Sequence, residues 1–281
     1  MTVYFNGSYQ PKDAVRVSPD DRGFLLGDGV YEVARTYGGR LFALERHLDR
    51  LRYSLGELRI SGVAVDGLGQ VFEELLRRNG LTAGDALVYL QVTRGAARRA
   101  HGFPDPAVPP TVYAYAAPIA LQFDPAKGVA AITVPDRRWA RCDIKTISLV
   151  ANCLANQEAQ EAGAFEAIMV RDGVALEGSH TSLFGVFGGE VWTAPLSNYI
   201  LPGITRAILI DVCRAAGIPA HERPIQLEQL RRADEVFLAG TTTEALGVVR
   251  LDGRPVGTGV PGPVTRRLRE LFLKETARRP P

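Results

Sequence analysis

The chain has 281 residues, of which 46% are apolar and 23% are charged, and its formal net charge at pH 7 is +2. This composition is typical of a soluble globular protein with one large domain or two ordinary ones. A nearly neutral charge without blocks of like charge argues against nucleic acid or an anionic membrane surface as the main partner.

The N-terminal segment and the cysteine usage predict a cellular compartment. The opening MTVYFNGSYQPKD has early polar residues and no apolar core, unlike a secretory signal. No apolar run approaches the length of about 18 residues that a membrane span needs. The three cysteines (Cys142, Cys153 and Cys213) lack metal-ligand spacing, and the four histidines form no HxH or HxxxH pair. We therefore expect a reduced, cytoplasmic protein without a protein-ligated metal ion.

Turns and β-rich runs dominate the first half of the chain, with two helical patterns among them. Leu44, Leu48, Leu51 and Leu55 recur at helical spacing, and Gly80 is a stop signal for the second helix. In chain order, the first half predicts strands around an Asn6-Gly7 turn over 3–9, a hairpin around Gly38-Gly39 over 29–44, helices over 44–58 and 71–80, and strands over 86–95 and 111–119.

Prolines concentrate between residues 103 and 127. We expect a crossing between two domains near residues 118–127, which divides the chain into domains 1–120 and 121–281. The second half predicts strands over 128–134, 167–173 and 234–240, helices over 149–163, 203–217 and 264–276, and a frayed tail over 277–281. Antiparallel strands interleaved with a few helices predict an α+β fold. The common glycine-rich nucleotide-binding motifs are absent from the sequence.

Lys145 stands out because only four of the 33 basic residues are lysine. It lies in the mostly uncharged run CDIKTIS, with Asp143 two positions away. One interpretation is a surface or salt-bridged lysine. The other is a Schiff-base lysine, because arginine stays protonated and cannot supply a free amine. The residue pattern alone leaves both open.

Glu177 follows three apolar residues and precedes a turn rich in glycine and serine. It is either a turn-flanking carboxylate or a buried carboxylate, and a buried one needs a cationic partner. The protonated pyridine nitrogen of pyridoxal phosphate is one such partner.

Three further features are candidates for phosphate binding. Residues 203–205 open a predicted helix, where free N–H groups favour an anion, although an ordinary capped helix has the same pattern. Thr241–Thr243 follow a predicted strand and form either a second anion site or a plain turn. Arg50 is a candidate phosphate arginine on helix 44–58, but nothing local separates it from Arg46.

Seven motifs in a fixed order, from about residue 2 to residue 275, resemble the class IV pyridoxal phosphate aminotransferases. They are DRGFLLGDGVYEV, ERHLDRL, QVTRG with RAHGFP, CDIKTISLVANCLANQEAQEAG, ALEGSHTSLFGV, LPGITR and AGTTTE. The resemblance implies fold type IV, an α+β fold of two lobes. The N-terminal lobe is a small α/β domain, and the C-terminal lobe is a larger pseudo-barrel domain that carries the cofactor lysine.

The resemblance also implies which residues bind the cofactor, pyridoxal 5′-phosphate. Lys145 forms the Schiff base, Glu177 pairs with the pyridine nitrogen, and Arg50 binds the phosphate, which resolves the choice left open above. The other implied contacts are Leu201 at the ring and Ile204, Thr205 and Thr241 at the phosphate.

Within the family, RRAHGFP and GDGVYEV resemble the D-amino acid transaminases. Arg99 and His101 match the RxH pair that holds the substrate carboxylate, and Tyr31 matches a third contact. A guanidinium binds a carboxylate bidentately, and tyrosine and histidine add donors. In the family this pair reaches across from the partner subunit, so the resemblance implies a homodimer with shared active sites. One departure is Ser182, where these transaminases tend to have asparagine.

The activity implied by the resemblance is transamination of D-amino acids, with D-alanine and 2-oxoglutarate giving pyruvate and D-glutamate. The expected partners are therefore small amino acids and 2-oxo acids, not nucleic acid or membrane. An L-branched-chain aminotransferase and an aminodeoxychorismate lyase are alternatives with the same cofactor, and both are disfavoured by Arg99 and His101. A non-catalytic cofactor-binding module is disfavoured by intact Lys145, Glu177 and Arg50.

Overall fold

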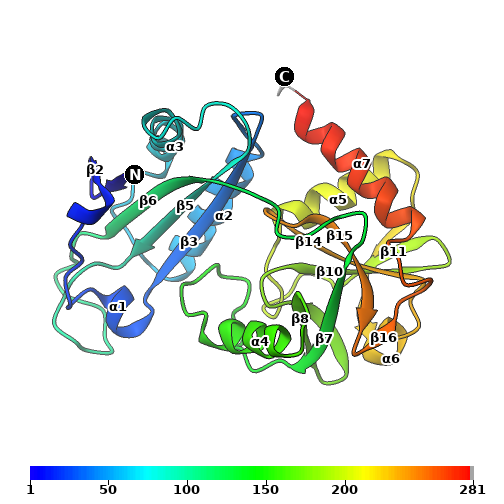
Figure 1. The fold of residues 1–281 in the computed structure, drawn as a ribbon. Helices are drawn as coiled ribbons and strands as arrows, with labels where there is room; N and C mark the ends of the chain where they lie inside the picture. The colour runs from blue at the N-terminus through cyan, green and yellow to red at the C-terminus, as the bar shows by residue number, and fades with distance from the viewer. Residues whose placement is uncertain (279–281) are drawn as a thin grey trace. The chain divides into compact units, whose positions relative to one another are not determined.

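The structure is a computed structural model, and it describes residues 1–278 (Figure 1). Its contacts divide the chain into two compact units. The first unit contains Met1–Ala120 together with Ile144–Leu149, and the second contains Leu121–Asp143 and the chain from Val150 onward. The segment carrying Lys145 thus packs with the first unit, which differs from the predicted division of the chain, because its backbone pairs with strand β3. Of the predicted frayed tail, Ala277 ends a helix, and residues 279–281 lie outside the described residues.

The first unit is built on an antiparallel six-stranded sheet in the order β2-β1-β6-β5-β3-β4. The predicted hairpin is present, because β3 and β4 pair across Gly38-Gly39. The long neighbours β3, β5 and β6 pair along nearly their whole length. The strands span Thr2–Phe5 (β1), Ser8–Pro11 (β2), Gly29–Tyr37 (β3), Arg40–Leu41 (β4), Ala86–Thr93 (β5) and Thr111–Pro118 (β6).

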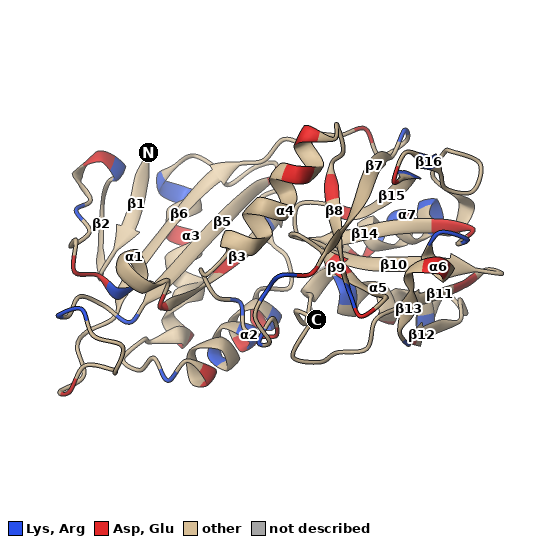
Figure 2. Ribbon diagram, turned by 90° about the horizontal axis from the view of Figure 1, so that it is seen from below, with Lys and Arg blue, Asp and Glu red and all other residues tan. Residues whose placement is uncertain are grey.

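Helices α2 (Leu44–Glu57) and α3 (Leu68–Arg78) bury their apolar stripes against this sheet. Leu48, Leu51 and Leu55 of α2 lie in one core with alternate residues of β3, β5 and β6, as the helical spacing predicted. Acidic and basic residues are interspersed along the outer side of α2 (Figure 2). The unit also contains the short helix α1 (Arg22–Leu26) and single 3₁₀ turns at Lys12–Ala14 and Val65–Gly67.

The second unit contains a ten-stranded sheet whose central part closes on itself. Strands β10, β14, β15, β7, β8 and β9 pair in that order, and β9 pairs again with β10 through Glu177 and Ser182. This closed ring confirms the predicted pseudo-barrel. The ring strands span Val129–Pro135 (β7), Glu166–Arg171 (β8), Val174–Gly178 (β9), Ser182–Phe187 (β10), Glu235–Gly240 (β14) and Glu244–Leu251 (β15).

The remaining elements extend or cover the ring. Helix α5 packs on β14, α7 packs on β15, and α4 packs on β7 and β8. These elements span Val150–Glu161 (α4), Ile204–Ala215 (α5), Leu227–Leu230 (α6), Pro263–Ala277 (α7), Glu190–Thr193 (β11), Ala220–Glu222 (β12), Ile225–Gln226 (β13) and Arg254–Pro255 (β16). The predicted α+β fold in two parts is therefore confirmed. Within residues 1–278, none of the helices is both long and apolar enough to cross a membrane.

Candidate active site

Lys145 lies on a short segment that pairs with the start of β3. Its carbonyl accepts a hydrogen bond from the Tyr31 N–H at 2.9 Å, and its own N–H donates to Ser54 Oγ at 3.2 Å. The side chain is half-buried, and Nζ lies 4.2 Å from the centroid of the Tyr31 ring. Since an aromatic face attracts a cation, the amine is held against Tyr31 while its backbone is fixed on both sides.

Tyr31 is itself packed in a row of tyrosines on neighbouring strands. Its ring stacks on Tyr89 at a centroid distance of 5.8 Å, and Tyr89 stacks on Tyr115 at 5.3 Å. Val30 and Ala34 of β3 lie in the core under the helices. Because side chains alternate along a strand, Tyr31 occupies the other face of the sheet. The tyrosine row therefore restricts the ring against which the lysine lies.

Arg50 is bound to a buried carboxylate of β3. Its Nε and Nη2 donate to the two oxygens of Glu32 at 2.7 and 2.8 Å, and Nδ1 of His47 lies 2.9 Å from Glu32. Burial opposes ionisation of Glu32, but the charge and hydrogen bonds of Arg50 outweigh it and lower the Glu32 pKa to about 2. Burial also lowers the pKa of His47. Ser54, which binds the Lys145 backbone, lies one turn beyond Arg50 on the same buried face of α2.

Glu177, on β9 of the second unit, is a buried carboxylate with a weaker set of donors. It accepts a short hydrogen bond from Arg138 Nη1 and one from the Leu201 N–H at 3.2 Å. Burial raises the Glu177 pKa, and the charge of Arg138 offsets this only in part. The two predicted residues Glu177 and Leu201 are thus in contact. Because Arg138 offsets burial only in part, a further cation would stabilise the ionised Glu177 carboxylate.

The start of α5 and the Thr241 turn lie near Glu177 in the second unit. Ser182 on β10 pairs with Glu177 on one side and with Ala239 of β14, shortly before Thr241, on the other. A Cβ at Gly203, the residue before α5, would lie 2.7 Å from Ser182 Oγ, so only glycine permits this close approach. Ile204 and the buried Thr205 then present the first N–H groups of the helix, which lack intrahelical partners.

Arg99 and His101 lie in the connection between β5 and β6, and both side chains are exposed. Within residues 1–278, neither has a hydrogen-bond or ion-pair partner. The structure therefore leaves both side chains available for a ligand, unlike Tyr31, which is half-buried on Lys145.

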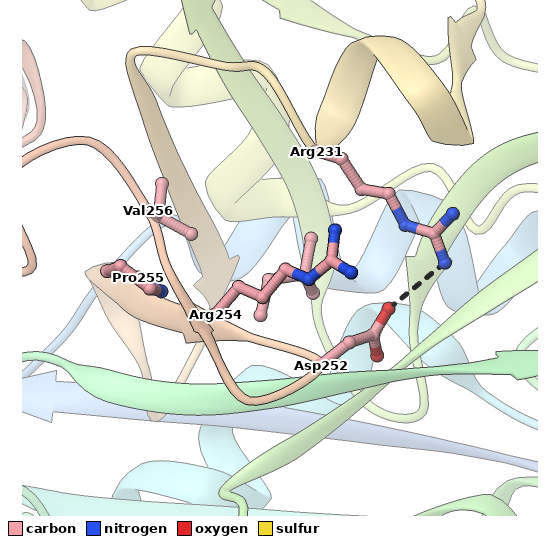
Figure 3. A pocket seen from close by; sticks show the side chains of 6 residues that line it. Arg231, Asp252, Arg254, Pro255 and Val256 are labelled. Carbon is pink, nitrogen blue, oxygen red and sulfur yellow. Dashed lines mark hydrogen bonds and ion pairs between the residues drawn. The ribbon is translucent and has the colours of Figure 1, made fainter.

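A surface cavity of about 210 Å³ lies elsewhere in the second unit, where Arg231 pairs with Asp252 at 3.4 Å (Figure 3). Its other lining residues are Leu251, Arg254, Pro255 and Val256. None of the predicted site residues lines it, and its walls come from Arg231, just after α6, and from the β15–β16 hairpin with the residue that follows it. The predicted site residues therefore do not lie at this cavity.

Comparison with known proteins decides the family. The model of the family described as amino-transferase class IV matches residues 29–251. The chain belongs to the class IV aminotransferases. It is 40% identical to the D-alanine aminotransferase of Staphylococcus haemolyticus over 97% of this chain and 96% of that one. It is also 40% identical to the D-alanine aminotransferase of Bacillus licheniformis, over 99% of both chains.

A solved structure similar to this class IV aminotransferase is the T.th. branched-chain amino acid aminotransferase complexed with N-(5′-phosphopyridoxyl)-L-glutamate. The TM-score is 0.90 at 32% identity, with 99% of this chain and 95% of that chain covered. The protein is thus a pyridoxal 5′-phosphate-dependent aminotransferase. The raised pKa of Glu177 fits a cationic ring nitrogen, and the uncapped start of α5 fits a phosphate. The roles of the individual residues stay predictions.

The structure adds three charged residues of this aminotransferase that sequence reasoning missed. Glu32 and Arg138 hold the predicted residues Arg50 and Glu177. Glu166 is fully buried at the start of β8 and accepts hydrogen bonds from Ser179 Oγ at 2.5 Å and Thr181 Oγ1 at 2.7 Å. These bonds fix the run that departs from the family pattern. For Glu32 and Glu166, the sequence signal was a glutamate at an inward position of an otherwise apolar strand, as in VYEV and FEAI.

Proposed function

We propose that this enzyme transfers the amino group of D-amino acids, with D-alanine and 2-oxoglutarate giving pyruvate and D-glutamate. The observation that carries the proposal is 40% identity, over nearly the whole of both chains, to two enzymes named D-alanine aminotransferase. A chain similar at that level over its full length has the same fold and motif order from end to end. The RxH motif at Arg99 and His101 supports the same substrate class.

A specific observation favours a second candidate, an L-branched-chain aminotransferase. Solved structures of branched-chain enzymes match the fold with TM-scores up to 0.90. Their identity is lower, at 32% and 27% for these two. Since fold alone does not decide substrate, the higher identity to the D-alanine enzymes favours the first candidate.

Lys145 is assigned the proton transfers of the reaction. When bound, pyridoxal 5′-phosphate supplies an aldehyde that condenses with amines and a ring that withdraws electrons from the substrate α-carbon. The Lys145 amine would take the proton from that α-carbon and give it up again during the transfer, so Lys145 would serve first as base and then as acid. The backbone bonds to Tyr31 and Ser54 restrict where Nζ can reach, which supports transfer between two fixed atoms. Proximity of this kind lowers the barrier entropically.

The second unit supplies the groups that hold the ring and phosphate. Glu177 would hold the protonated ring nitrogen, and that cation would favour the carboxylate against the burial that raises its pKa. Leu201 would pack against the ring, and its N–H donates to Glu177. The phosphate contacts proposed are Ile204, Thr205 and Thr241 of this unit, together with Arg50 of the first unit.

Substrate recognition is assigned to Tyr31, Arg99 and His101, which bind the carboxylate. We propose a homodimer in which Arg99 and His101 serve the partner's site. Their exposure supports this role, as do the exposed apolar side chains of Phe24 on α1 and Val150 on α4, which are 75% and 74% accessible. We also propose a cytoplasmic location, supported by three unpaired cysteines, two of them buried.

Absorbance of the purified holoenzyme between about 300 and 500 nm tests the proposal, because the cofactor band changes when an amino group is transferred. D-alanine is expected to bleach the long-wavelength band, and 2-oxoglutarate to restore it. Bleaching by L-leucine or L-glutamate alone would establish the branched-chain candidate instead. A band that no amino acid bleaches would contradict both transaminase candidates and favour the lyase.

A further inference from the structure

The connection between β5 and β6, residues 94–110, must hold Arg99 and His101 in place although both are exposed. β5 ends at Thr93 and β6 begins at Thr111. Long connections of this kind within a compact domain are usually functional. A guanidinium and an imidazole that bind one carboxylate need positions defined to within about 0.5 Å. The structure shows what defines them.

Arg22 binds the backbone on both sides of His101. Its Nη1 donates to the carbonyl of Ala100 at 2.7 Å and to the carbonyl of Gly102 at 3.2 Å. The Arg22 side chain is only 3% exposed, and its Nε donates to Asp28 at 2.8 Å. A single buried guanidinium thus fixes the two peptide groups that flank the proposed carboxylate ligand.

Asp28 joins Arg22 to a second buried arginine. Arg94 donates through Nε and Nη2 to both oxygens of Asp28 at 2.8 and 2.9 Å. Burial opposes ionisation of Asp28, but the hydrogen bonds of Arg94 and Arg22 outweigh it and lower the Asp28 pKa. The carboxylate therefore stays charged and keeps both arginines in fixed orientations.

Arg94, the first residue of the connection, also binds it to the two residues that follow α2. Nη1 donates to the Arg59 carbonyl at 3.0 Å, and Nη2 donates to the Leu58 carbonyl at 2.7 Å. The face of its guanidinium lies 3.6 Å from the centroid of the Phe103 ring. Cation–π stacking of this kind fixes a residue two positions beyond His101.

We propose that the Arg22–Asp28–Arg94 cluster positions Arg99 and His101 for the substrate carboxylate, and that Arg22 is a positioning residue for substrate binding. The inference rests on the proposed function, because it gives these two residues a carboxylate to bind. No member of the cluster needs to touch substrate. Its effect is to keep the connection ordered before substrate arrives, so that binding does not have to order it.

Arg22→Met in the holoenzyme tests the inference. Methionine is of similar length and apolar, and Asp28 keeps both hydrogen bonds from Arg94. We expect KM for D-alanine to rise about 10- to 100-fold, because small displacements of binding groups have effects of this size. The value of kcat should stay within about threefold, since an effect confined to binding raises KM alone. Backbone hydrogen exchange in residues 98–104 should become faster.

Two controls accompany this variant. Arg231→Met removes an arginine paired with an aspartate in the second unit (Figure 3), and should change neither KM nor exchange in residues 98–104. If Arg22→Met does not fold, Phe103→Ala removes the stacking on Arg94 at 3.6 Å, and a looser contact with Arg59 at 5.9 Å, from a residue that is 51% exposed. It should raise KM about threefold, in line with an exposed cation–π contact, with faster exchange in the same residues.

An unchanged KM in Arg22→Met, or in Phe103→Ala where that variant replaces it, would overturn the inference. So would a raised KM with unchanged exchange in residues 98–104, because Arg22 would then act by another route. Failure of the proposed function is separable from this result. If the wild-type enzyme accepts only L-amino acids, the D-specific proposal fails, and the same comparison with the accepted amino acid still decides whether the cluster positions the connection.

Discussion

Glu32 in the first unit and Glu177 in the second are both buried, and each is paired with one arginine. Their pKa values nonetheless move in opposite directions. Glu32 receives two hydrogen bonds from Arg50 and lies against His47, which lowers its pKa despite burial. Glu177 receives one hydrogen bond from Arg138 and one from a backbone N–H, and burial prevails.

The difference teaches that a buried acid–arginine pair has two distinct uses. When the donors saturate the carboxylate, the pair is part of the fold and holds a strand to a helix, as Glu32 does between β3 and α2. When they do not, the carboxylate can accept a further cation, which is the property that a cofactor ring nitrogen requires. The surrounding donors decide between these uses, since residue type and burial are the same.

The largest expected effect comes from Lys145→Ala. This variant tests whether the Lys145 segment, which pairs with β3 beside Glu32, contributes to catalysis. Loss of the proton-transferring amine should lower turnover about 10⁴-fold or more. The long-wavelength absorption of the bound cofactor should also disappear. Near-normal turnover in this variant would exclude Lys145 as the catalytic lysine.

The matched changes Glu177→Gln and Glu32→Gln sharpen the comparison directly. Glu177→Gln should lower kcat about 10²- to 10³-fold, as the removal of a preorganised electrostatic partner does elsewhere, while thermal stability does not fall. Glu32→Gln should destabilise the protein by about 3 kcal/mol, because it removes the carboxylate charge that pairs with the buried Arg50. Thermal melts and steady-state kinetics on both variants measure this contrast. Equal stability losses in the two variants would abolish the distinction.

Arg138→Met tests whether Arg138 limits how far burial raises the Glu177 pKa. Without it, burial should raise the Glu177 pKa further, so the acid limb of the kcat/KM profile should move to higher pH by about one unit or more. Activity at pH 7 should fall about tenfold. Arg171→Met is the control, because Arg171 shares the Asp136 partner of Arg138 and belongs to the same group of charges. A shift of equal size in the control would mean that the pairing with Glu177 is not the cause.

Stability as a function of pH should also separate the two carboxylates. The folded pKa of Glu32, about 2, lies below its ordinary value of 4.5, so its contribution of about 3 kcal/mol is present above pH 4.5 and is lost as the pH falls towards 2. The raised pKa of Glu177 has the opposite sign, and its ionised form disfavours folding above that pKa. Glu177→Gln should therefore gain stability relative to wild type as the pH rises from 4.5 through the raised pKa of Glu177. A flat difference in melting temperature across that range would contradict this.

The sequence predicted most elements because their patterns are local. Leucines four or three positions apart define α2 wherever the helix packs, and Gly38-Gly39 permits the tight turn of the β3–β4 hairpin. The closed ring was expected from the resemblance alone, since the pairing of β9 with both β8 and β10 joins strands by contacts that no local pattern reveals.

The candidate site likewise contains residues that the sequence predicted and partners that only the tertiary structure shows. Motif order indicated Lys145, Glu177 and Arg50, although nothing in the local run separated Arg50 from Arg46. It did not indicate their partners. Arg138 looks like an ordinary charge in the sequence, and Glu32 is marked only by its inward position in an apolar strand. They meet Glu177 and Arg50 only through the folding of distant strands and helices.

The sequence was sufficient for the family, the cofactor and the helices and strands, because these follow from residue types at short spacing and from the order of motifs. The tertiary structure was needed for the position of the Lys145 segment beside β3, the opposite pKa shifts of two buried glutamates, and the attachment of the Arg99–His101 connection to Arg22. The physical reason is that hydrogen bonding and burial of a charge depend on which distant atoms lie within about 3 Å of it.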